Sequence, residues 1–177
     1  MTRNGLLIGV FAASLLLGGC SNRSIGNKID DQFLDPDVSS AISAAAPNLS
    51  SPTSHIVTSS YNGVILIAGQ TPEAELKDKA GQAARGVNGV RKVHNELQIQ
   101  QPTSLLVRSN DTLVTSKIKT LMLADSTVPS TRIKVITENG VVFLMGIVTR
   151  QEGASATSVV ANAAGVQKIV KLFEYTD

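Results

Sequence analysis

Two copies of one short segment constrain this chain more than any other feature. Asn62-Gly63 leads into the apolar run 64–68 and a glycine, and Asn139-Gly140 leads into the apolar run 141–145 and a glycine. Asn-Gly is the strongest short signal for a two-residue hairpin, because a type I′ turn needs positive φ at both central residues. The short, β-branched runs behind the turns are typical of buried strands. The sequence therefore predicts two hairpins, a domain-sized interval apart.

The similarity continues beyond each hairpin. A helical segment from about residue 72 to 85 precedes Gly89-Val90, and one from about 150 to 164 precedes Gly165-Val166. The interval between the copies is nearly the same at both ends and is too long for a solenoid unit. We therefore expect two copies of one small domain.

Each copy predicts the order helix, strand, strand, helix, strand. In the first copy the expected strands are 55–61, 64–70 and 90–99, and the helices are 37–46 and a segment with Thr71 as N-cap and Pro72 at N1. In the second copy the strands are 133–138, 141–148 and 166–175, and the helices are 111–124 and 150–164. The predicted fold class is α+β: two tandem αββαβ domains, each a three-stranded sheet with two helices on one face. The expected boundaries are 35–99 for the first domain, 100–109 for a linker and 110–177 for the second domain.

The N-terminus resembles a bacterial lipoprotein signal. Arg3 and the apolar run 6–17, too short to span a bilayer, precede Leu17-Gly18-Gly19-Cys20. This resemblance implies a signal peptide over 1–19, cleavage before Cys20, acylation of that cysteine and a lipidated tether over 20–34. A buried or disulfide-bonded cysteine is the alternative, but Cys20 is the only cysteine, so no internal disulfide can form. Ser21, rather than Asp, favours the outer membrane, with the protein facing the periplasm.

Composition and motifs argue against several classes of function. A formal charge of +2, 3% aromatic residues and no tryptophan give no electrostatic or stacking surface for nucleic acid. His55 and His94 lack clustered partners, and no hydrolase, metalloprotease or phosphate-loop motif occurs. We expect no enzyme, metal, cofactor or small-molecule substrate.

An acidic group precedes the first predicted helix and leaves one alternative open. Its members are Asp30, Asp31, Asp35 and Asp37. A calcium site would need a ligand spacing that is absent here. Charge at a helix start, in a solvated loop, is the favoured interpretation.

The repeated αββαβ pattern resembles the BON domain family. Its members share the αββαβ order, a turn and strand like Asn139-Gly140 with 141–146, and a glycine-valine step like Gly165-Val166. The likeness extends to a lipoprotein type with two such domains. It implies a protein of envelope integrity that binds anionic phospholipid through its second domain and gathers at division sites.

The residues of the second domain's first helix allow such a contact. On a helical wheel Val114, Ile118, Leu121 and Met122 face the sheet. The opposite side carries two leucines without a core to fill, a lysine and small hydroxyl residues, and these form the predicted phospholipid-binding set: Leu113, Ser116, Lys119, Thr120 and Leu123. Leucines can enter the acyl boundary while a lysine meets headgroup phosphates.

Two other interpretations of that face stay open. It could bind an envelope protein, such as assembly or cell-wall remodelling machinery, or the two domains could simply stiffen a tether. The first domain's matching helix carries Asp35, Asp37, serines and alanines instead. We therefore expect the second domain to bind and the first to position it.

Overall fold

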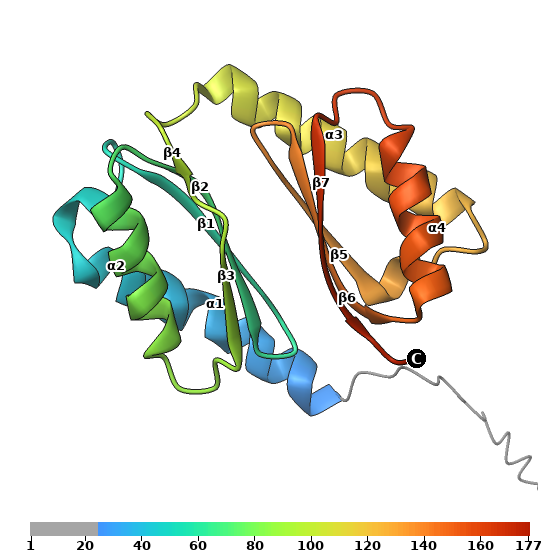
Figure 1. The fold of residues 1–177 in the computed structure, drawn as a ribbon, viewed down its shortest axis with the longest axis horizontal. Coiled ribbons are helices and arrows are strands. Elements are labelled where there is room, and N and C mark those ends of the chain that lie inside the picture. Colours follow the sequence, from blue (N-terminus) through green and yellow to red (C-terminus); the bar gives the residue numbers. More distant parts are fainter. Residues whose placement is uncertain (1–24) are drawn as a thin grey trace, which may run out of the picture.

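The computed structural model describes residues 25–177, with side chains from residue 34 onward (Figure 1). The predicted signal peptide 1–19 and Cys20 lie outside the described residues. The first half comprises α1 (Ile25–Ala45), η1 (Pro47–Leu49), β1 (His55–Tyr61), β2 (Val64–Thr71), α2 (Ala74–Arg85), β3 (Lys92–Asn95) and β4 (Gln98–Ile99). The second half comprises α3 (Leu105–Ala124), η2 (Ser130–Arg132), β5 (Ile133–Glu138), β6 (Val141–Val148), α4 (Arg150–Ala161) and β7 (Lys168–Tyr175).

Both predicted hairpins are present with the predicted turn chemistry. Asn62 and Gly63 have φ of 53° and 73°, and Asn139 and Gly140 have φ of 50° and 72°. Positive φ at both central residues is the requirement of a type I′ turn, which asparagine and glycine meet at little cost. The turns fix the strand registers, so that Tyr61 pairs with Val64 and Glu138 with Val141.

The sheets place the repeated apolar strands at their centres. The second sheet has the order β5-β6-β7, with β5 antiparallel and β7 parallel to β6. The first has the order β1-β2-β3, and the short β4 extends the same edge by pairing with β2. Every residue of β2 and nearly every residue of β6 is buried. A strand covered on only one face would alternate buried and exposed residues, so both faces of these strands are covered.

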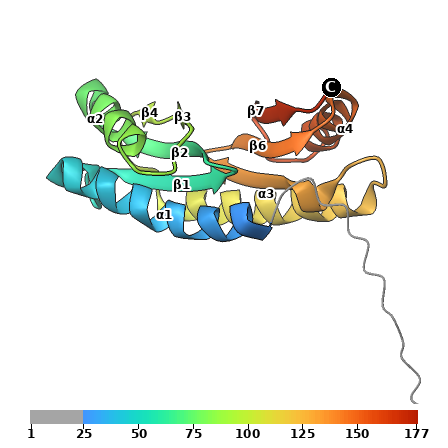
Figure 2. The ribbon, with the colours of Figure 1, turned by 90° about the horizontal axis from the view of Figure 1, so that it is seen from below.

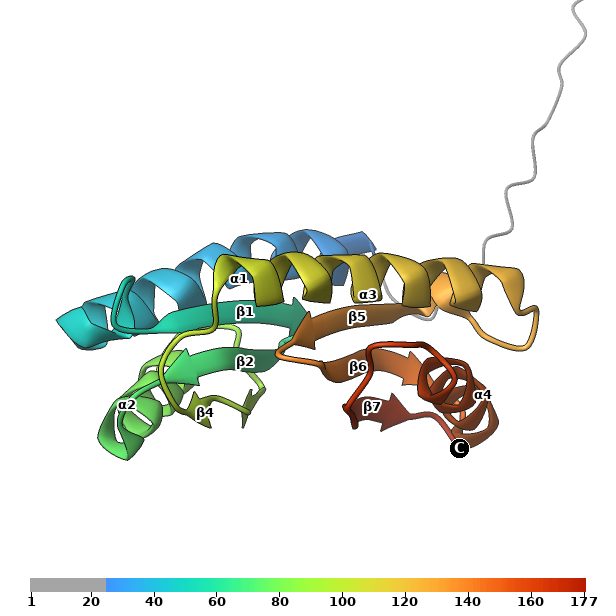
Figure 3. The ribbon, with the colours of Figure 1, turned by 90° about the horizontal axis from the view of Figure 1, so that it is seen from above.

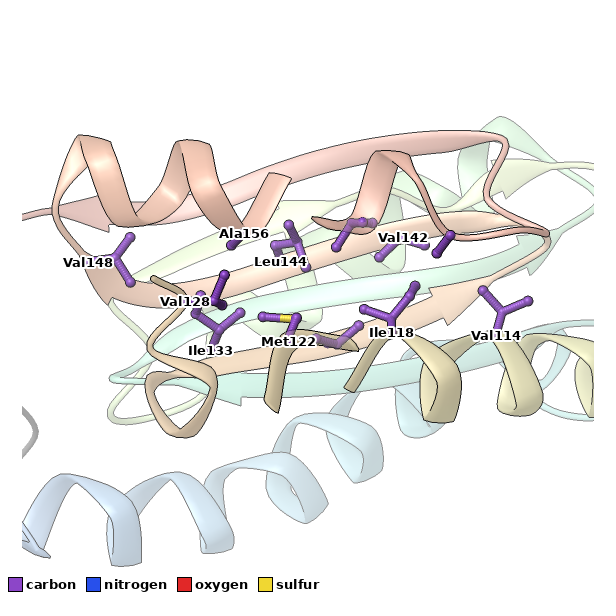
Figure 4. Close-up of a cluster of buried hydrophobic side chains, with 12 residues drawn as sticks. Val114, Ile118, Met122, Val128, Ile133, Val142, Leu144, Val148 and Ala156 are labelled. Carbon is purple, nitrogen blue, oxygen red and sulfur yellow. The ribbon is translucent and has the colours of Figure 1, made fainter. Parts of the chain in front are cut away.

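Alternate residues of these central strands serve different cores. In β6, Val142 and Leu144 face α3 and α4, whereas Phe143 and Met145 face the other domain. Figure 4 shows the helix-facing cluster of the second domain, in which Val114, Ile118 and Met122 of α3 reach the sheet. The two sheets face each other at the centre of the molecule, with α2 and α4 on their outer sides (Figure 1). This confirms the α+β class with two helices on one face of each sheet.

Between the facing sheets lies another apolar cluster, which joins the two domains. Its members come from β1, β2, β6 and β7: Tyr61, Val64, Leu66, Ala68, Val141, Phe143, Met145 and Leu172. Polar contacts surround it. The Tyr61 hydroxyl donates to the Arg132 carbonyl at 2.8 Å, and Lys134 Nζ lies 3.4 Å from a carboxylate oxygen of Asp35.

The helices begin elsewhere than predicted. α1 starts at Ile25 and α3 at Leu105, so the expected tether and linker both contribute residues to helices. Pro36 lies inside α1, one residue before the predicted start of this helix at residue 37. Ser104 caps α3 through a bond from Val107 N to its hydroxyl (3.4 Å).

Three further local predictions differ from the structure. Thr71 is not an N-cap; it continues β2, fully buried, and Glu73 precedes α2 instead. The third strand of the first domain is broken into β3 and β4, because the chain turns Leu97 into the core between them. α4 ends at Ala161 and β7 starts at Lys168, each a few residues short of the prediction.

Candidate functional site

Helix α3 is held against its sheet by one face. Val114, Ile118 and Met122 are buried there, as predicted. Leu121 was also expected on this face, but it is 37% exposed and lies at the flank, lining a surface hollow with Val159 of α4. Its place on the wheel is at the border of the inner face, where the packing of α4 decides which residues are covered.

A buried carboxylate fixes the position of α3 relative to the hairpin. Asp111, where the predicted helix began, is only 3% exposed and lies within α3. Its two oxygens accept the backbone N–H groups of Asn139 (2.8 Å) and Gly140 (2.9 Å). Because both donors belong to the type I′ turn, α3 and the β5–β6 hairpin form one rigid unit.

The outward face of α3 carries the predicted residues, and all five are exposed. Leu113 and Leu123 are each 69% exposed. Two further leucines, Leu105 (76%) and Leu106 (80%), lie at the start of the same helix. We call these four residues the leucine stripe. Leu105 and Leu106 fall in the predicted linker and were therefore not expected on this face, although Ser104, three residues before Val107, is a helix-start signal.

Hydroxyl groups between the leucines are internally bonded. Thr112 Oγ1 donates to the Arg108 carbonyl (3.0 Å), Ser116 Oγ to the Thr112 carbonyl (2.9 Å) and Thr120 Oγ1 to the Ser116 carbonyl (3.1 Å). Each donor is therefore already satisfied by the preceding turn of the helix. A face with paired hydroxyls costs less to transfer from water than one with free donors.

Two lysines flank the leucine stripe. Lys117 and Lys119 are exposed and lie on opposite sides of the outward face. Within the described part of the chain, no carboxylate forms an ion pair with either ammonium group. The helix thus offers apolar side chains between two lysines that have no ion-pair partner in the described part of the chain.

Within residues 34–45, the matching helix of the first domain lacks this combination. From residue 34 onward, the exposed positions of α1 are occupied by Pro36, Asp37, serines and alanines. No large apolar side chain there is exposed. Over the part of α1 whose side chains are described, the two helices therefore present chemically different surfaces.

The acidic group does not converge within the described residues. Asp35 faces Lys134 of the other domain, while the side chains of Asp30 and Asp31 lie outside the described part. Among the described residues no three metal-ligating side chains come together. The histidines are far apart in the fold, with His55 at the start of β1 and His94 on β3.

A polar cluster at the domain junction was not predicted. His55 Nε2 lies 3.6 Å from a carboxylate oxygen of Glu138, and Arg108 Nη1 lies 3.4 Å from His55 Nδ1. Burial, together with the charge of Asp111, raises the pKa of Glu138 to about 7, while Gln70 and Arg108 oppose that shift. Burial and then Arg108 lower the pKa of His55. These residues come from both domains, so sequence proximity gave no signal for the cluster.

No helix within residues 25–177 has the length and apolar character needed to cross a bilayer.

Comparison with known proteins gives consistent relatives. Outer membrane lipoprotein DolP of Haemophilus influenzae is 38% identical over 155 residues, covering 88% of this chain and 79% of the relative. A 21 kDa hemolysin of Actinobacillus pleuropneumoniae is 35% identical, covering 86% of this chain and 78% of the relative. Osmotically-inducible protein Y of Escherichia coli is 31% identical, covering 85% of this chain and 75% of the relative.

The family comparison covers both halves of the fold. The sequence model of the BON domain matches residues 31–101 and again residues 110–177. The two matched segments correspond to the two sheets and their helices. The chain belongs to the BON domain family, of which it carries two copies in tandem.

Proposed function

We propose that this protein is a non-enzymatic outer-membrane lipoprotein that maintains envelope integrity by binding anionic phospholipid through the outward face of α3. In this proposal an acylated Cys20 anchors the chain in the periplasmic leaflet, and the selective contact concentrates it at division sites. The observation that carries the proposal is the leucine stripe between Lys117 and Lys119, neither of which has an ion-pair partner among the described residues.

The chemistry of the stripe favours an interfacial lipid contact. Leucine side chains gain free energy when they leave water, at about 25 cal/mol per Å² of apolar surface. Ammonium groups near an anionic membrane contribute roughly 1 kcal/mol each. The internally bonded hydroxyls of Ser116 and Thr120 lower the cost of bringing the face to the boundary.

The arrangement of the molecule is compatible with two simultaneous membrane contacts. Figures 2 and 3 show α1 and α3 on the same side of the molecule, each beyond the edge strand of its own sheet. Cys20 precedes the first residue of α1 by five positions, a stretch that spans at most about 18 Å. An anchor at Cys20 would raise the effective concentration of α3 at the membrane, so the helix need not bind tightly alone.

A relative supports the proposed location. The Haemophilus influenzae protein is named an outer membrane lipoprotein, and it is similar over most of both chains. Together with the signal-like segment before Cys20, this name supports the same anchoring here.

Vesicle co-sedimentation tests the lipid contact. The chain from Ser21 onward, which keeps every described element, is pelleted with neutral or anionic vesicles at low and high salt. We expect selective, salt-sensitive binding to anionic vesicles, because screening weakens exposed charge interactions. Leu123→Asp and Lys119→Glu should each reduce binding about tenfold.

Matched controls locate the effect. Lys168→Glu makes the same charge change on β7, and Ile99→Asp makes a similar apolar-to-acidic change at an exposed position of β4. Both should bind like the unaltered chain. Equal losses in all four variants would remove α3 from the proposal. If the unaltered chain ignores all vesicles, the face becomes a candidate for a protein partner, the other function that an exposed apolar stripe supports.

A further inference from the structure

A small hollow opens beside the leucine stripe, between α3 and the edge strand of its sheet. It has a volume of about 140 Å³. Its lining comes from α3, η2 and β5: Lys119, Met122, Leu123, Ser130, Thr131, Ile133 and Val135. β5 is the outer strand of the order β5-β6-β7, so no further strand of its own sheet closes this side.

The interior of the hollow is apolar. Met122, Ile133 and Val135 are buried members of the second domain's core cluster, and Figure 4 shows Met122 and Ile133 next to one another. The hollow is therefore large enough for a short length of hydrocarbon and presents it with a mainly apolar surface.

The rim of the hollow belongs to the proposed lipid-binding face. Leu123 is a member of the leucine stripe, and Lys119 is its flanking cation. No carboxylate in the described part of the chain pairs with Lys119. From the rim inward, the groups are a lysine, a leucine and the apolar interior. An amphiphile with a negative headgroup and an apolar chain matches this order, because the headgroup meets Lys119 while the chain passes Leu123 into the hollow.

We propose that the hollow receives part of one acyl chain of the anionic phospholipid whose headgroup lies at Lys119. This inference rests on the proposed function and adds to it. The stripe alone would recognise a charged apolar surface, whereas an occupied hollow makes the protein bind individual lipid molecules. The contact then depends on the chain of the lipid as well as on its charge.

Methionine methyl signals provide the test. The chain from Ser21 onward contains Met122, which lines the hollow, and Met145, which lies fully buried between the sheets. The protein is labelled with ¹³C at the methionine methyl groups, and Met145→Leu assigns the two signals. Dihexanoyl phosphatidylglycerol is added below its micellar concentration, and glycerol 3-phosphate serves as the headgroup without chains.

We expect the Met122 signal to move with the short-chain lipid and not with glycerol 3-phosphate, while the Met145 signal stays in place. Thr131→Phe, at an exposed position of the rim, should fill the opening and weaken the Met122 response about tenfold. Thr176→Phe makes the same substitution at an exposed position of the C-terminus and should leave the response unchanged.

Vesicle pelleting in parallel separates the two proposals. Normal pelleting with anionic vesicles, without a Met122 response to the short-chain lipid, would overturn the acyl-chain site and leave the proposed function standing. A Met122 response without pelleting would support the hollow and contradict the membrane-surface contact. Equal movement of both methionine signals would contradict the inference, since it would indicate a general change of the fold.

Discussion

At the scale of single residues, the turn chemistry could be predicted and the side chains that hold the turn could not. Asn139-Gly140 predicts the hairpin because few other residue pairs tolerate positive φ twice. Asp111 accepts the backbone N–H groups of both turn residues, yet its sequence neighbourhood resembles a helix start. A contact between positions so far apart in the chain leaves no local signature.

Replacing the Asp111 carboxylate should destabilise the second domain. Asp111→Ala leaves the buried N–H of Gly140 without its acceptor, and we expect the free energy of unfolding to fall by about 3 kcal/mol. Urea denaturation measures the loss. Asp125→Ala is the control, because Asp125 also accepts two bonds, from Thr127, at an exposed site; it should cost less than about 1 kcal/mol. Equal losses would contradict the role of burial.

The buried Glu138 should make stability depend on pH. Its pKa is about 7 when folded and 4.5 ordinarily, so the folded chain holds this proton more tightly than the unfolded chain. Its stabilising contribution is complete below pH 4.5 and is lost as the pH rises through 7. Glu138→Gln, neutral throughout, should therefore gain stability relative to the unaltered chain between these values, by roughly 1–3 kcal/mol above pH 7.

Thermal unfolding of the two chains from pH 4 to 8 measures that difference. His55 is present in both chains, so the opposite tendency of its lowered pKa largely cancels in the comparison. A difference between the chains that stays constant over the range would show that Glu138 titrates as it does in water.

At the scale of elements, predictions succeeded where two local signals agreed. The strands of the second hairpin, 133–138 and 141–148, match residue for residue, since the turn fixes one end and the apolar runs fix the other. The start of α3 was missed because Pro102 and its polar neighbours indicate a linker just before the Ser104 cap. The first turns of this helix therefore had no predicted role.

The first turns of α3, which the prediction had placed in the linker, should contribute to membrane binding. Leu105→Ser and Leu106→Ser each remove an exposed apolar side chain from the leucine stripe without touching the core. We expect each to weaken pelleting with anionic vesicles three- to tenfold, roughly 0.7–1.4 kcal/mol. Leu121→Ser, at the flank of the same helix, should have a smaller effect. A larger effect at Leu121 would move the contact toward α4.

At the scale of the whole molecule, the packing of the domains was beyond prediction. A strand that is apolar throughout indicates burial on both faces but does not identify the second partner. Here the partner is the other copy, with Leu66 and Phe143 among the residues of the shared cluster. The polar contacts around it, such as Tyr61 to Arg132, also join segments that are distant in sequence.

Removing a large side chain from the shared cluster should affect both domains. Phe143 is 3% exposed, and Phe143→Ala should cost about 3–5 kcal/mol. In the unaltered chain we expect the two domains to unfold together in one transition. In the variant we expect two separate unfolding transitions, one for each domain. Calorimetry distinguishes these cases, with Val142→Ala, which faces only the helices, as the control. Two transitions in the unaltered chain would contradict the coupling.

Because both faces of the central strands are covered, each domain depends on the other copy. A gene that lost either copy would encode a half whose sheet displays Leu66 and Ala68, or Phe143 and Met145, to water. Such a half would be prone to aggregate, because its exposed apolar face would associate with other apolar surfaces. A chain built in this way is therefore harder to shorten by one copy than a chain whose two domains are independent.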